Sequence, residues 1–417
     1  MQLEARVKSS IELLDIFFRS ESPFDVVLAK YFQHNKWIGA NDRRAVAEFT
    51  YSIFRKFEKI KFLTSKITND FGRFFVLAYL KREKCYSISQ IEEIFSGRTY
   101  APTKLSEFEK RFLDNLPSEV PSYAELNYPV WLEPYFLKAF GDENFSNEMQ
   151  ALNERAFVDL RVNTLISSKD EVKNLLQKDF EITETEYSDT CLRIINGRIG
   201  RGHPIIQKGL VEIQDEGSQL IAEACHASPG DTVVDFCAGA GGKTLALASY
   251  MQNKGRLFAL DKFAERLKFA QQRLKRAQVS NTFCQEITNK WMKRHEQVAD
   301  VVLVDAPCSG SGTWRRNPDM RAKFKPSDLK ELIKVQADIL ASAQKLVKPG
   351  GRLIYSTCSV FKEEDEEQAQ NFLKQFPEFF AKPIELNHYN GDYLKLSPFK
   401  NKTDGFFAAV FQKSSKI

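Results

Sequence analysis

The sequence contains no long hydrophobic run and few cysteines, and both shortages narrow the possible classes of protein. No stretch approaches roughly 18 uncharged apolar residues, which excludes a transmembrane helix. The seven cysteines form no Cys-x-x-Cys pair, so neither a zinc ribbon nor a disulfide scaffold fits. The first residues, MQLEARVKSS, are charged and lack the apolar core of a signal peptide. We therefore expect a cytoplasmic enzyme with reduced thiols, no metal and no membrane partner.

Length and charge set the next limits. The chain has 417 residues, enough for two or three domains, and its 60 Lys+Arg against 55 Asp+Glu leave a net charge of +5. This small excess permits nucleic acid as a partner but does not establish it. The positive charge is concentrated locally, because residues 51–84 carry nine Lys/Arg and three Asp/Glu. That segment is either a solvated helix face or a surface that contacts phosphates.

Hydrophobic periodicity divides the chain into three predicted domains. Residues 1–140 have helical spacing almost throughout and end in a proline-containing stretch. Residues 141–222 form a small α+β domain, with strands predicted at 158–165, 182–187 and 191–195 around a helix at 168–177. Residues 223–417 alternate strands with long helices, which predicts an α/β fold with a doubly wound parallel sheet. The acidic run 363–367 is expected to be the favourable first turn of a helix.

A glycine-rich turn follows the first strand of the third domain, in the sequence Asp235-Phe-Cys-Ala-Gly-Ala-Gly-Gly-Lys-Thr244. A P-loop requires glycine where Cys237 stands, and a dinucleotide-binding fingerprint requires glycine where Thr244 stands. S-adenosylmethionine remains as the candidate ligand, with its carboxylate and amino group held by the turn. Asp261, at the end of the next strand, can take the ribose hydroxyls. The alternative is a purely structural turn.

Two cysteines are predicted at the carboxyl ends of buried strands, one in Asp305-Ala-Pro-Cys308 and one in Thr-Cys358-Ser. Ligands in open α/β sheets bind at that edge. A thiolate that adds to C6 of cytosine makes C5 reactive toward a methyl donor, and a second thiol can help to release the product. Asp305 could stabilise charge on the ring. The alternative for any cysteine is a small buried apolar residue, which we assign to Cys85, Cys191, Cys225 and Cys284.

Taken together, these motifs resemble those of the RsmB/Nop/Sun family of RNA cytosine-C5 methyltransferases. The resemblance rests on DFCAGAGGKT (235–244), DAPCSGSG (305–312) and YSTCS (355–359), supported by LRVNT (160–164), QDEGSQ (214–219) and DGFF (404–407). It implies a Rossmann-like class I methyltransferase domain. The N-terminal third looks like a NusB-type helical RNA-binding domain, a pairing typical of the RsmB branch, whose members methylate small-subunit ribosomal RNA.

The resemblance also implies roles for individual residues. Cys358 matches the nucleophile, Cys308 the cysteine that helps to release product, and Asp305 the acid shared by donor and base, while Lys243 faces the target base. The implied donor-binding residues are Cys237, Ala238, Gly239, Ala240, Gly241, Gly242, Lys243, Asp261, Glu286 and Asp305. Gly239-Ala240 stands where the family usually has Ala-Pro, and Glu286 where it usually has Asp. We therefore expect a more flexible loop and weaker donor binding.

RNA contacts are predicted beside the chemistry. Trp314, Arg315 and Arg316 directly follow the Pro-Cys loop and suit a flipped base with its flanking phosphates, and Arg161 could extend this track. The alternative is an ordinary exposed loop. The predicted enzyme is a monomeric 16S ribosomal RNA methyltransferase. A transfer RNA methyltransferase and an inactive NusB-like RNA-binding assembly factor remain as alternatives.

Overall fold

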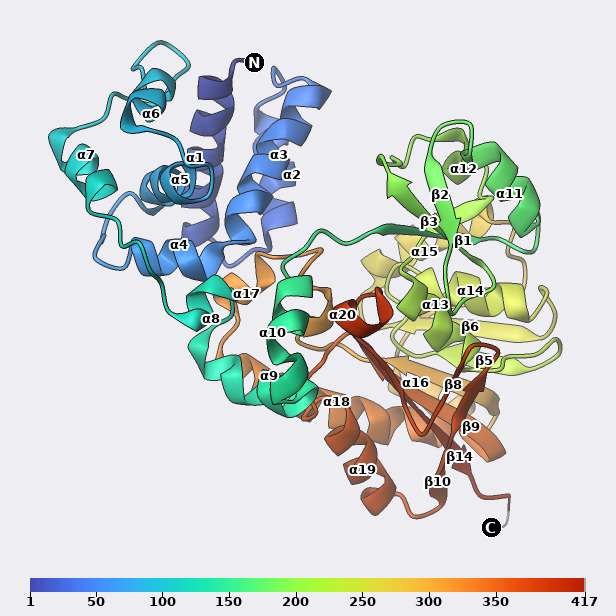
Figure 1. Ribbon diagram of the computed structural model, residues 1–417. Helices are drawn as coiled ribbons and strands as arrows, with labels where there is room; N and C mark the ends of the chain where they lie inside the picture. The colour runs from blue at the N-terminus through green and yellow to red at the C-terminus, as the bar shows by residue number, and fades with distance from the viewer. Residues whose placement is uncertain (416–417) are drawn as a thin grey trace. The chain divides into compact units, whose positions relative to one another are not determined.

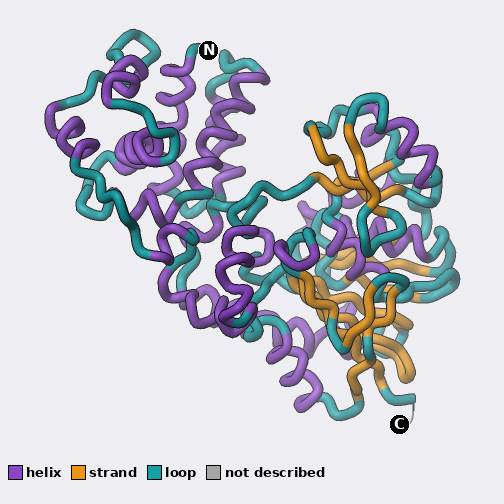
Figure 2. The backbone as a smooth tube through the Cα atoms, viewed as in Figure 1, coloured by secondary structure: helices purple, strands orange, loops and turns teal. Residues whose placement is uncertain are grey.

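The structure is a computed structural model that describes residues 1–415, and it divides into two compact units (Figure 1). The first unit comprises Met1–Leu137, Asp142–Glu154 and Trp314–Phe324, and the second comprises the remaining segments. Strands are confined to the second unit (Figure 2). The boundaries of the three predicted domains stay a prediction, because a division into two compact units does not test them.

The first unit is helical and has a phenylalanine-rich core. Phe17 packs edge-on against Phe24 and Phe54, with ring centroids 5.9 and 4.9 Å away. Ser87 and Ser106 begin two of its helices with capping boxes. Its helices are α1 (Leu3–Arg19), α2 (Phe24–His34), α3 (Ala40–Phe54), α4 (Phe57–Leu63), α5 (Phe71–Arg82), α6 (Ile88–Ile94), α7 (Glu107–Asp114), α8 (Ser122–Glu125), η1 (Val130–Leu132), most of α9 (Glu133–Phe140), α10 (Asp142–Ala151) and α17 (Met320–Lys323).

Residues 314–324 interrupt the second unit in sequence and fold into the first. The guanidinium of Arg321 is 1% exposed and donates to the Asn127 carbonyl and to Asn153 Oδ1, each at 2.6 Å. Its guanidinium carbon also lies 5.2 Å from the ring centroid of Trp314. Buried polar groups require such partners. The segment after the Pro-Cys loop is therefore an integral part of the helical unit.

The second unit contains a small four-stranded sheet of order β2-β3-β1-β4. Its strands are β1 (Val158–Val162), β2 (Glu181–Glu184), β3 (Cys191–Asn196) and β4 (Val211–Ile213), with α11 (Lys169–Leu176) and α12 (Pro204–Gln207) beside them. Ser168 caps α11 as predicted. A buried ion pair between Arg193 and Asp159, 2.6 Å long, joins β3 to β1.

The larger sheet of this unit has the order β10-β14-β9-β8-β5-β6-β7, with β13 beside β14. Its strands are β5 (Thr232–Asp235), β6 (Arg256–Asp261), β7 (Thr282–Glu286), β8 (Ala299–Asp305), β9 (Val347–Thr357), β10 (Phe379–Lys382), β13 (Leu394–Leu396) and β14 (Phe406–Lys413). The helices of this part are α13 (Glu216–Glu223), α14 (Gly242–Tyr250), α15 (Ala264–Arg276), α16 (Asn289–Arg294), η2 (Ser311–Thr313), α18 (Pro326–Ala343), η3 (Gln344–Leu346), α19 (Glu366–Gln375) and α20 (Pro398–Asn401). A separate hairpin pairs β11 (Ile384–Leu386) with β12 (Tyr389–Gly391).

The α/β class predicted from the sequence is confirmed, with one correction to the sheet. Strands β5 to β9 run parallel, but β14 is antiparallel to β9. An antiparallel edge on an otherwise parallel sheet is common, and the uninterrupted apolar run of β14 does not reveal its direction. Helix α19 also begins later than predicted, at Glu366. Glu364 and Asp365 lie buried ahead of it instead of forming its first turn. Within residues 1–415 no helix is long and apolar enough to cross a membrane.

Candidate active site

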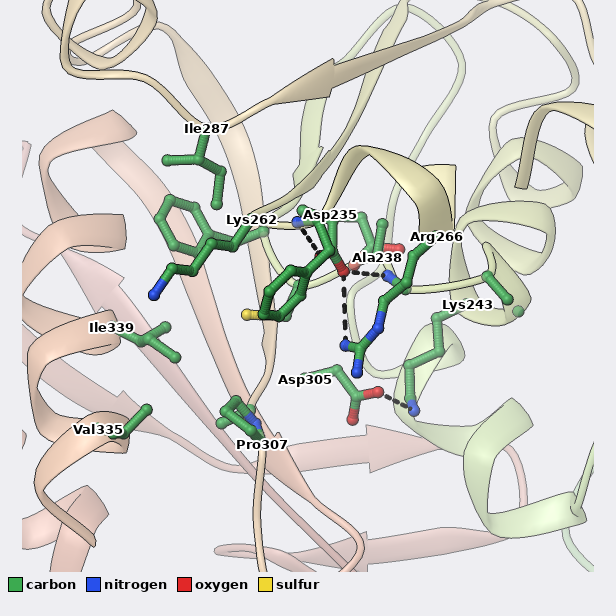
Figure 3. A pocket seen from close by; sticks show the side chains of 18 of the residues that line it. Asp235, Ala238, Lys243, Lys262, Arg266, Ile287, Asp305, Pro307, Val335 and Ile339 are labelled. Carbon is green, nitrogen blue, oxygen red and sulfur yellow. Dashed lines mark hydrogen bonds and ion pairs between the residues drawn. The ribbon is translucent and has the colours of Figure 1, made fainter. Parts of the chain in front are cut away.

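A cavity of about 990 Å³ opens at the carboxyl ends of β5, β6 and β8 (Figure 3). This is where ligands bind in open α/β sheets. Lys243 and Asp305 approach one another on one side of the cavity in Figure 3, and Ile339 and Val335 of α18 supply an apolar wall. Most residues of the predicted donor-binding turn line the cavity, namely Asp235, Cys237, Ala238, Gly239, Ala240, Gly242 and Lys243.

The turn between β5 and α14 depends on its glycines. Gly239 and Gly241 have φ values of +55° and +79°, which side chains disfavour. A Cβ on Gly241 would lie 3.0 Å from the Cβ of Ala270, so helix α15 closes off that side. A Cβ on Gly239, by contrast, would have no atom within 4 Å. The departure at Gly239-Ala240 therefore leaves open space in the turn.

Asp261 holds this turn in place. Its Oδ2 accepts the Gly239 N–H at 2.9 Å, and its Oδ1 accepts the Phe263 N–H at 2.8 Å. The carboxylate is 4% exposed and lines the cavity. Since an ionised carboxylate has about four acceptor positions, it can still receive hydroxyl groups of a ligand. Asp261 thus both shapes the turn and offers acceptors to the predicted ribose.

Asp235 supplies an unused acceptor in the same cavity. Its Oδ2 accepts the Thr244 hydroxyl at 2.6 Å, whereas its buried Oδ1 has no hydrogen-bond partner among the described residues. Burial raises the pKa of Asp235 to about 7. A cationic group placed here would favour the ionised carboxylate and satisfy Oδ1. The α-amino group of S-adenosylmethionine has that chemistry, so the donor set fits the predicted cofactor.

Lys243, Asp305 and Ser356 form a short polar chain beside the cavity. Lys243 Nζ donates to Asp305 Oδ2 at 2.7 Å, and the Ser356 hydroxyl donates to Asp305 Oδ1 at 3.1 Å. Burial lowers the pKa of Lys243, but the charge and hydrogen bond of Asp305 outweigh it and raise the pKa overall. Lys243 therefore remains an ammonium, 5.8 Å above the ring of Phe406. This pair can stabilise charge on a bound ring.

The two predicted thiols meet beside this chain. Cys308 follows β8 and Cys358 follows β9, and their sulfur atoms lie 3.4 Å apart. The Gly312 N–H donates to the Cys358 carbonyl at 3.0 Å, which ties the second loop to the first. The hydrogen bond with Cys358, followed by burial, raises the pKa of Cys308 well above its usual value. Cys308 is therefore held as a neutral thiol.

Other predicted site residues lie elsewhere. Glu286 is exposed at the end of β7, next to Asp261 in register, and does not line the cavity. Arg161 is 4% exposed and donates from Nη1 to Gln214 Oε1 at 2.6 Å and to the Gly242 carbonyl at 2.9 Å. Its guanidinium braces the donor turn, which contradicts the prediction of an RNA-contacting side chain.

The predicted RNA-binding cluster after the Pro-Cys loop is also largely buried. Trp314 is fully buried in the helical unit, where its ring packs against Phe136 with centroids 5.8 Å apart. The ring therefore presents no open face for a base, because packing inside the unit uses it. Arg315 is buried as well, whereas Arg316 is partly exposed. For Arg316 an RNA contact stays a prediction.

Three residues of the site were not singled out from the sequence. Gln214 lines the cavity, Ser356 orients Asp305, and Phe406 lies below Lys243. Gln214 lies in the motif QDEGSQ and Phe406 in DGFF, so these two motifs could have indicated both residues as members of the site. Within the part of the chain that is described, no group of three or more His, Cys, Asp or Glu could hold a metal ion.

Comparison with known proteins shows which family this chain is similar to. The family described as 16S rRNA methyltransferase RsmB/F matches residues 222–412, and its ferredoxin-like domain matches residues 128–198. A probable ribosomal RNA small subunit methyltransferase B of Bacillus subtilis is 32% identical, with 69% of this chain and 67% of the relative covered. Its counterpart in Synechocystis is 27% identical, with 99% of this chain and the whole relative covered.

Solved structures agree with the fold. The crystal structure of PH0851 is 28% identical, with a TM-score of 0.80 and 99% of each chain covered. A methyltransferase homolog from Pyrococcus horikoshii is 29% identical, with a TM-score of 0.61, over 71% of this chain and all of the other. The similarity to the first of these extends over both compact units.

Proposed function

Since this chain belongs to the RsmB/F family of 16S ribosomal RNA methyltransferases, we propose that it methylates C5 of a cytosine in 16S ribosomal RNA. S-adenosylmethionine is the methyl donor of the family. The observation that carries the reaction type is the pair of sulfurs 3.4 Å apart, on loops that continue from Asp305 and Ser356. Methylation of a ring nitrogen has no use for two thiols, whereas C5 of cytosine has.

In the proposed reaction Cys358 is the nucleophile. Its thiol loses its proton to water and the sulfur forms a bond to C6 of the cytosine. The electron pair of the C5–C6 double bond moves into the ring, where Asp305 and Lys243 stabilise the charge. The donor supplies a methyl cation equivalent that C5 captures. C5 then carries both the methyl group and its original proton. The product forms when that proton leaves and the bond between C6 and sulfur breaks.

Cys308 is proposed to remove the C5 proton. While Cys358 is free, its hydrogen bond and charge keep Cys308 protonated. Once the Cys358 sulfur is bonded to C6, both influences disappear and the pKa of Cys308 falls. Cys308 can then release its proton to water and accept the proton from C5 as the Cys358 thiolate departs. The two roles therefore follow from one coupled pair.

Substitution of each cysteine tests these roles. Cys358→Ala should abolish both methylation and any covalent adduct, whereas Cys308→Ala should accumulate a protein–RNA adduct that survives denaturation. Cys85→Ala is the control, because that thiol is exposed, not buried as predicted from the sequence, and its sulfur donates to the Arg82 carbonyl within the helical unit. The assays are transfer of labelled methyl groups to unmethylated small-subunit RNA and denaturing electrophoresis. Retained activity in Cys358→Ala would overturn the assignment.

The choice of RNA needs a separate experiment. Bisulfite mapping of ribosomal and transfer RNA from a deletion strain should reveal one unmethylated cytosine in 16S ribosomal RNA. Loss of the mark from a transfer RNA instead would establish the alternative substrate. Titration calorimetry with S-adenosylmethionine tests whether the protein is an inactive assembly factor, for which no heat of binding is expected. The monomeric state and cytoplasmic location stay predictions.

A further inference from the structure

A buried carboxylate lies behind the two thiols and takes part in none of the steps above. Glu364 is 0% exposed and lies just before α19, in the acidic run after Cys358. Burying a carboxylate is costly unless several donors satisfy it. The donors that satisfy this carboxylate are neutral, and they come from the two loops that carry the cysteines and from Gln336 of α18.

The two oxygens of Glu364 bridge the residues that follow the cysteines. Oε1 accepts the Ser309 N–H and Gln336 Nε2, each at 2.9 Å. Oε2 accepts the hydroxyls of Ser309 at 2.5 Å and Ser359 at 2.6 Å. Ser309 directly follows Cys308, and Ser359 directly follows Cys358. One carboxylate thus holds both loops at the position next to each sulfur.

The residues that precede the cysteines are held by neighbours of Glu364. Gln336, which donates to Glu364, also donates to the Pro307 carbonyl at 3.0 Å. Thr357 donates its hydroxyl to Asp365 at 2.5 Å. The backbone of Glu364 is fixed in turn, because the Tyr355 hydroxyl donates to its carbonyl at 2.5 Å. Each cysteine is therefore flanked on both sides by residues anchored to this cluster.

We propose that Glu364 is a positioning residue that fixes the separation and orientation of the Cys308 and Cys358 sulfurs for the second half of the reaction. The proposal rests on the catalytic roles assigned above. Glu364 touches no reacting atom and acts through the two serines. The Ser311 hydroxyl also joins the two loops, since it accepts from the Ser309 hydroxyl at 3.1 Å and from the Val360 N–H at 3.0 Å, but Glu364 contributes a carboxylate to this network.

The charge of Glu364 has a second consequence for the pair. The hydrogen bond with Cys358 and burial are the main causes of the raised pKa of Cys308, and the negative charge of Glu364 adds to them. The carboxylate therefore helps to keep Cys308 protonated until Cys358 has reacted. Neutralising Glu364 should lower the pKa of Cys308, and this change is separate from the loss of loop geometry.

Glu364→Gln is the informative variant, because it keeps the size of the side chain but replaces one acceptor with an NH₂ group. The expected turnover number falls about 100-fold, as for a misplacement of roughly 1 Å, with KM for RNA and donor nearly unchanged. The alkaline limb of the pH–rate profile should shift to lower pH. Glu364→Asp keeps the charge but shortens the reach, so it should restore the pH profile more than the turnover number.

Glu367→Gln is the matched control. It makes the same chemical change three residues away, on a side chain that is 44% exposed and paired with Lys138. Its turnover number and pH profile should equal those of the unchanged protein, because the pair is exposed and the Glu367 carboxylate accepts from Lys138, which lies outside both cysteine loops. A similar loss in this control would show that any lost acid in the run is harmful, and would overturn the specific role of Glu364.

A second measurement reports the geometry without catalysis. Diamide takes up two electrons and two protons as two thiols form a disulfide, and peptide mass spectrometry measures the Cys308–Cys358 link. The sulfurs at 3.4 Å should link readily in the unchanged protein and several-fold more slowly in Glu364→Gln. Equal linking rates and an unchanged turnover number would overturn the proposal.

The two proposals can fail separately. If Cys358→Ala remains active, the proposed reaction is wrong, while the linking rates still report whether Glu364 sets the distance between the sulfurs. If Glu364→Gln does not fold, as judged by thermal melting, Ser359→Ala carries the same two measurements. That variant removes a single hydroxyl that donates to Glu364 at 2.6 Å. Unchanged linking and turnover in folded Ser359→Ala would then count against the proposal.

Discussion

Gly312→Ala should damage both stability and catalysis, because the chain has no room for a side chain there. A Cβ on Gly312 would lie 2.2 Å from the Gly405 carbonyl oxygen. The Gly405 N–H donates to the Gly312 carbonyl at 2.9 Å, and the Gly312 N–H donates to the Cys358 carbonyl at 3.0 Å. The added methyl must therefore displace the closing strand segment or the Cys358 loop, and either movement breaks these bonds.

The magnitude follows from those contacts. Two hydrogen bonds are worth about 1 kcal/mol each, and overpacking costs about 1–3 kcal/mol. Alanine also lowers the conformational entropy of the unfolded chain, which offsets about 0.5–1 kcal/mol of this loss of stability. The expected loss is about 2–4 kcal/mol in the free energy of unfolding. For a unit of this size that corresponds to a decrease of roughly 5–10 °C in melting temperature.

Thermal melting and methyl transfer measure the outcome. We expect the lower melting temperature together with a fall of about 100-fold in turnover number, since the carbonyl of Cys358 loses its anchor. Gly200→Ala is the control, because a Cβ at that exposed glycine meets nothing within 4 Å. A shift under 1 °C with unchanged turnover in Gly312→Ala would refute the reasoning about close approach.

Two further predictions concern buried charges. The pKa of Asp235, about 7, lies above its unfolded value, so the folded state binds the proton more tightly and stability falls as pH rises from about 4 to 7. From about pH 4 to pH 7 the free energy of unfolding should fall by up to about 4 kcal/mol in the unchanged protein but not in Asp235→Asn, as denaturation curves at several pH values measure. Equal slopes of this free energy against pH in the two proteins would contradict the prediction. Arg321→Ala should destabilise the helical unit by about 3 kcal/mol, because the Asn127 carbonyl and Asn153 lose a buried donor. Calorimetry checks this against exposed Lys325→Ala, and equal melting temperatures would show that the buried guanidinium contributes nothing.

Local sequence was sufficient to predict the elements that build the site. Strand-to-turn transitions at Asp235, Asp305 and Cys358 depend on apolar runs that end in glycine, proline or serine, and these signals are short-range. Parallel strands deliver their carboxyl ends to one edge, so the meeting of the two thiols could be expected without coordinates. The direction of β14 could not, because an apolar run buried on both faces reads the same in either direction.

The roles of charged and aromatic residues depended on tertiary packing. The sequence suggested RNA contacts for Trp314 and Arg161, but the first is buried by helices of its own unit and the second braces the donor turn. It also suggested an ordinary helix start for the acidic run, in which Glu364 is in fact buried.

The sequence by itself determined the family, the donor turn and the two cysteines that meet at the sheet edge, because each of these is written in a contiguous motif. Only the tertiary structure decided which polar side chains support them. A hydrogen bond between Glu364 and Ser309 joins residues 55 positions apart, and such a contact leaves no local periodicity. Burial and partnership are properties of the folded chain, so they become visible only when distant segments are brought together.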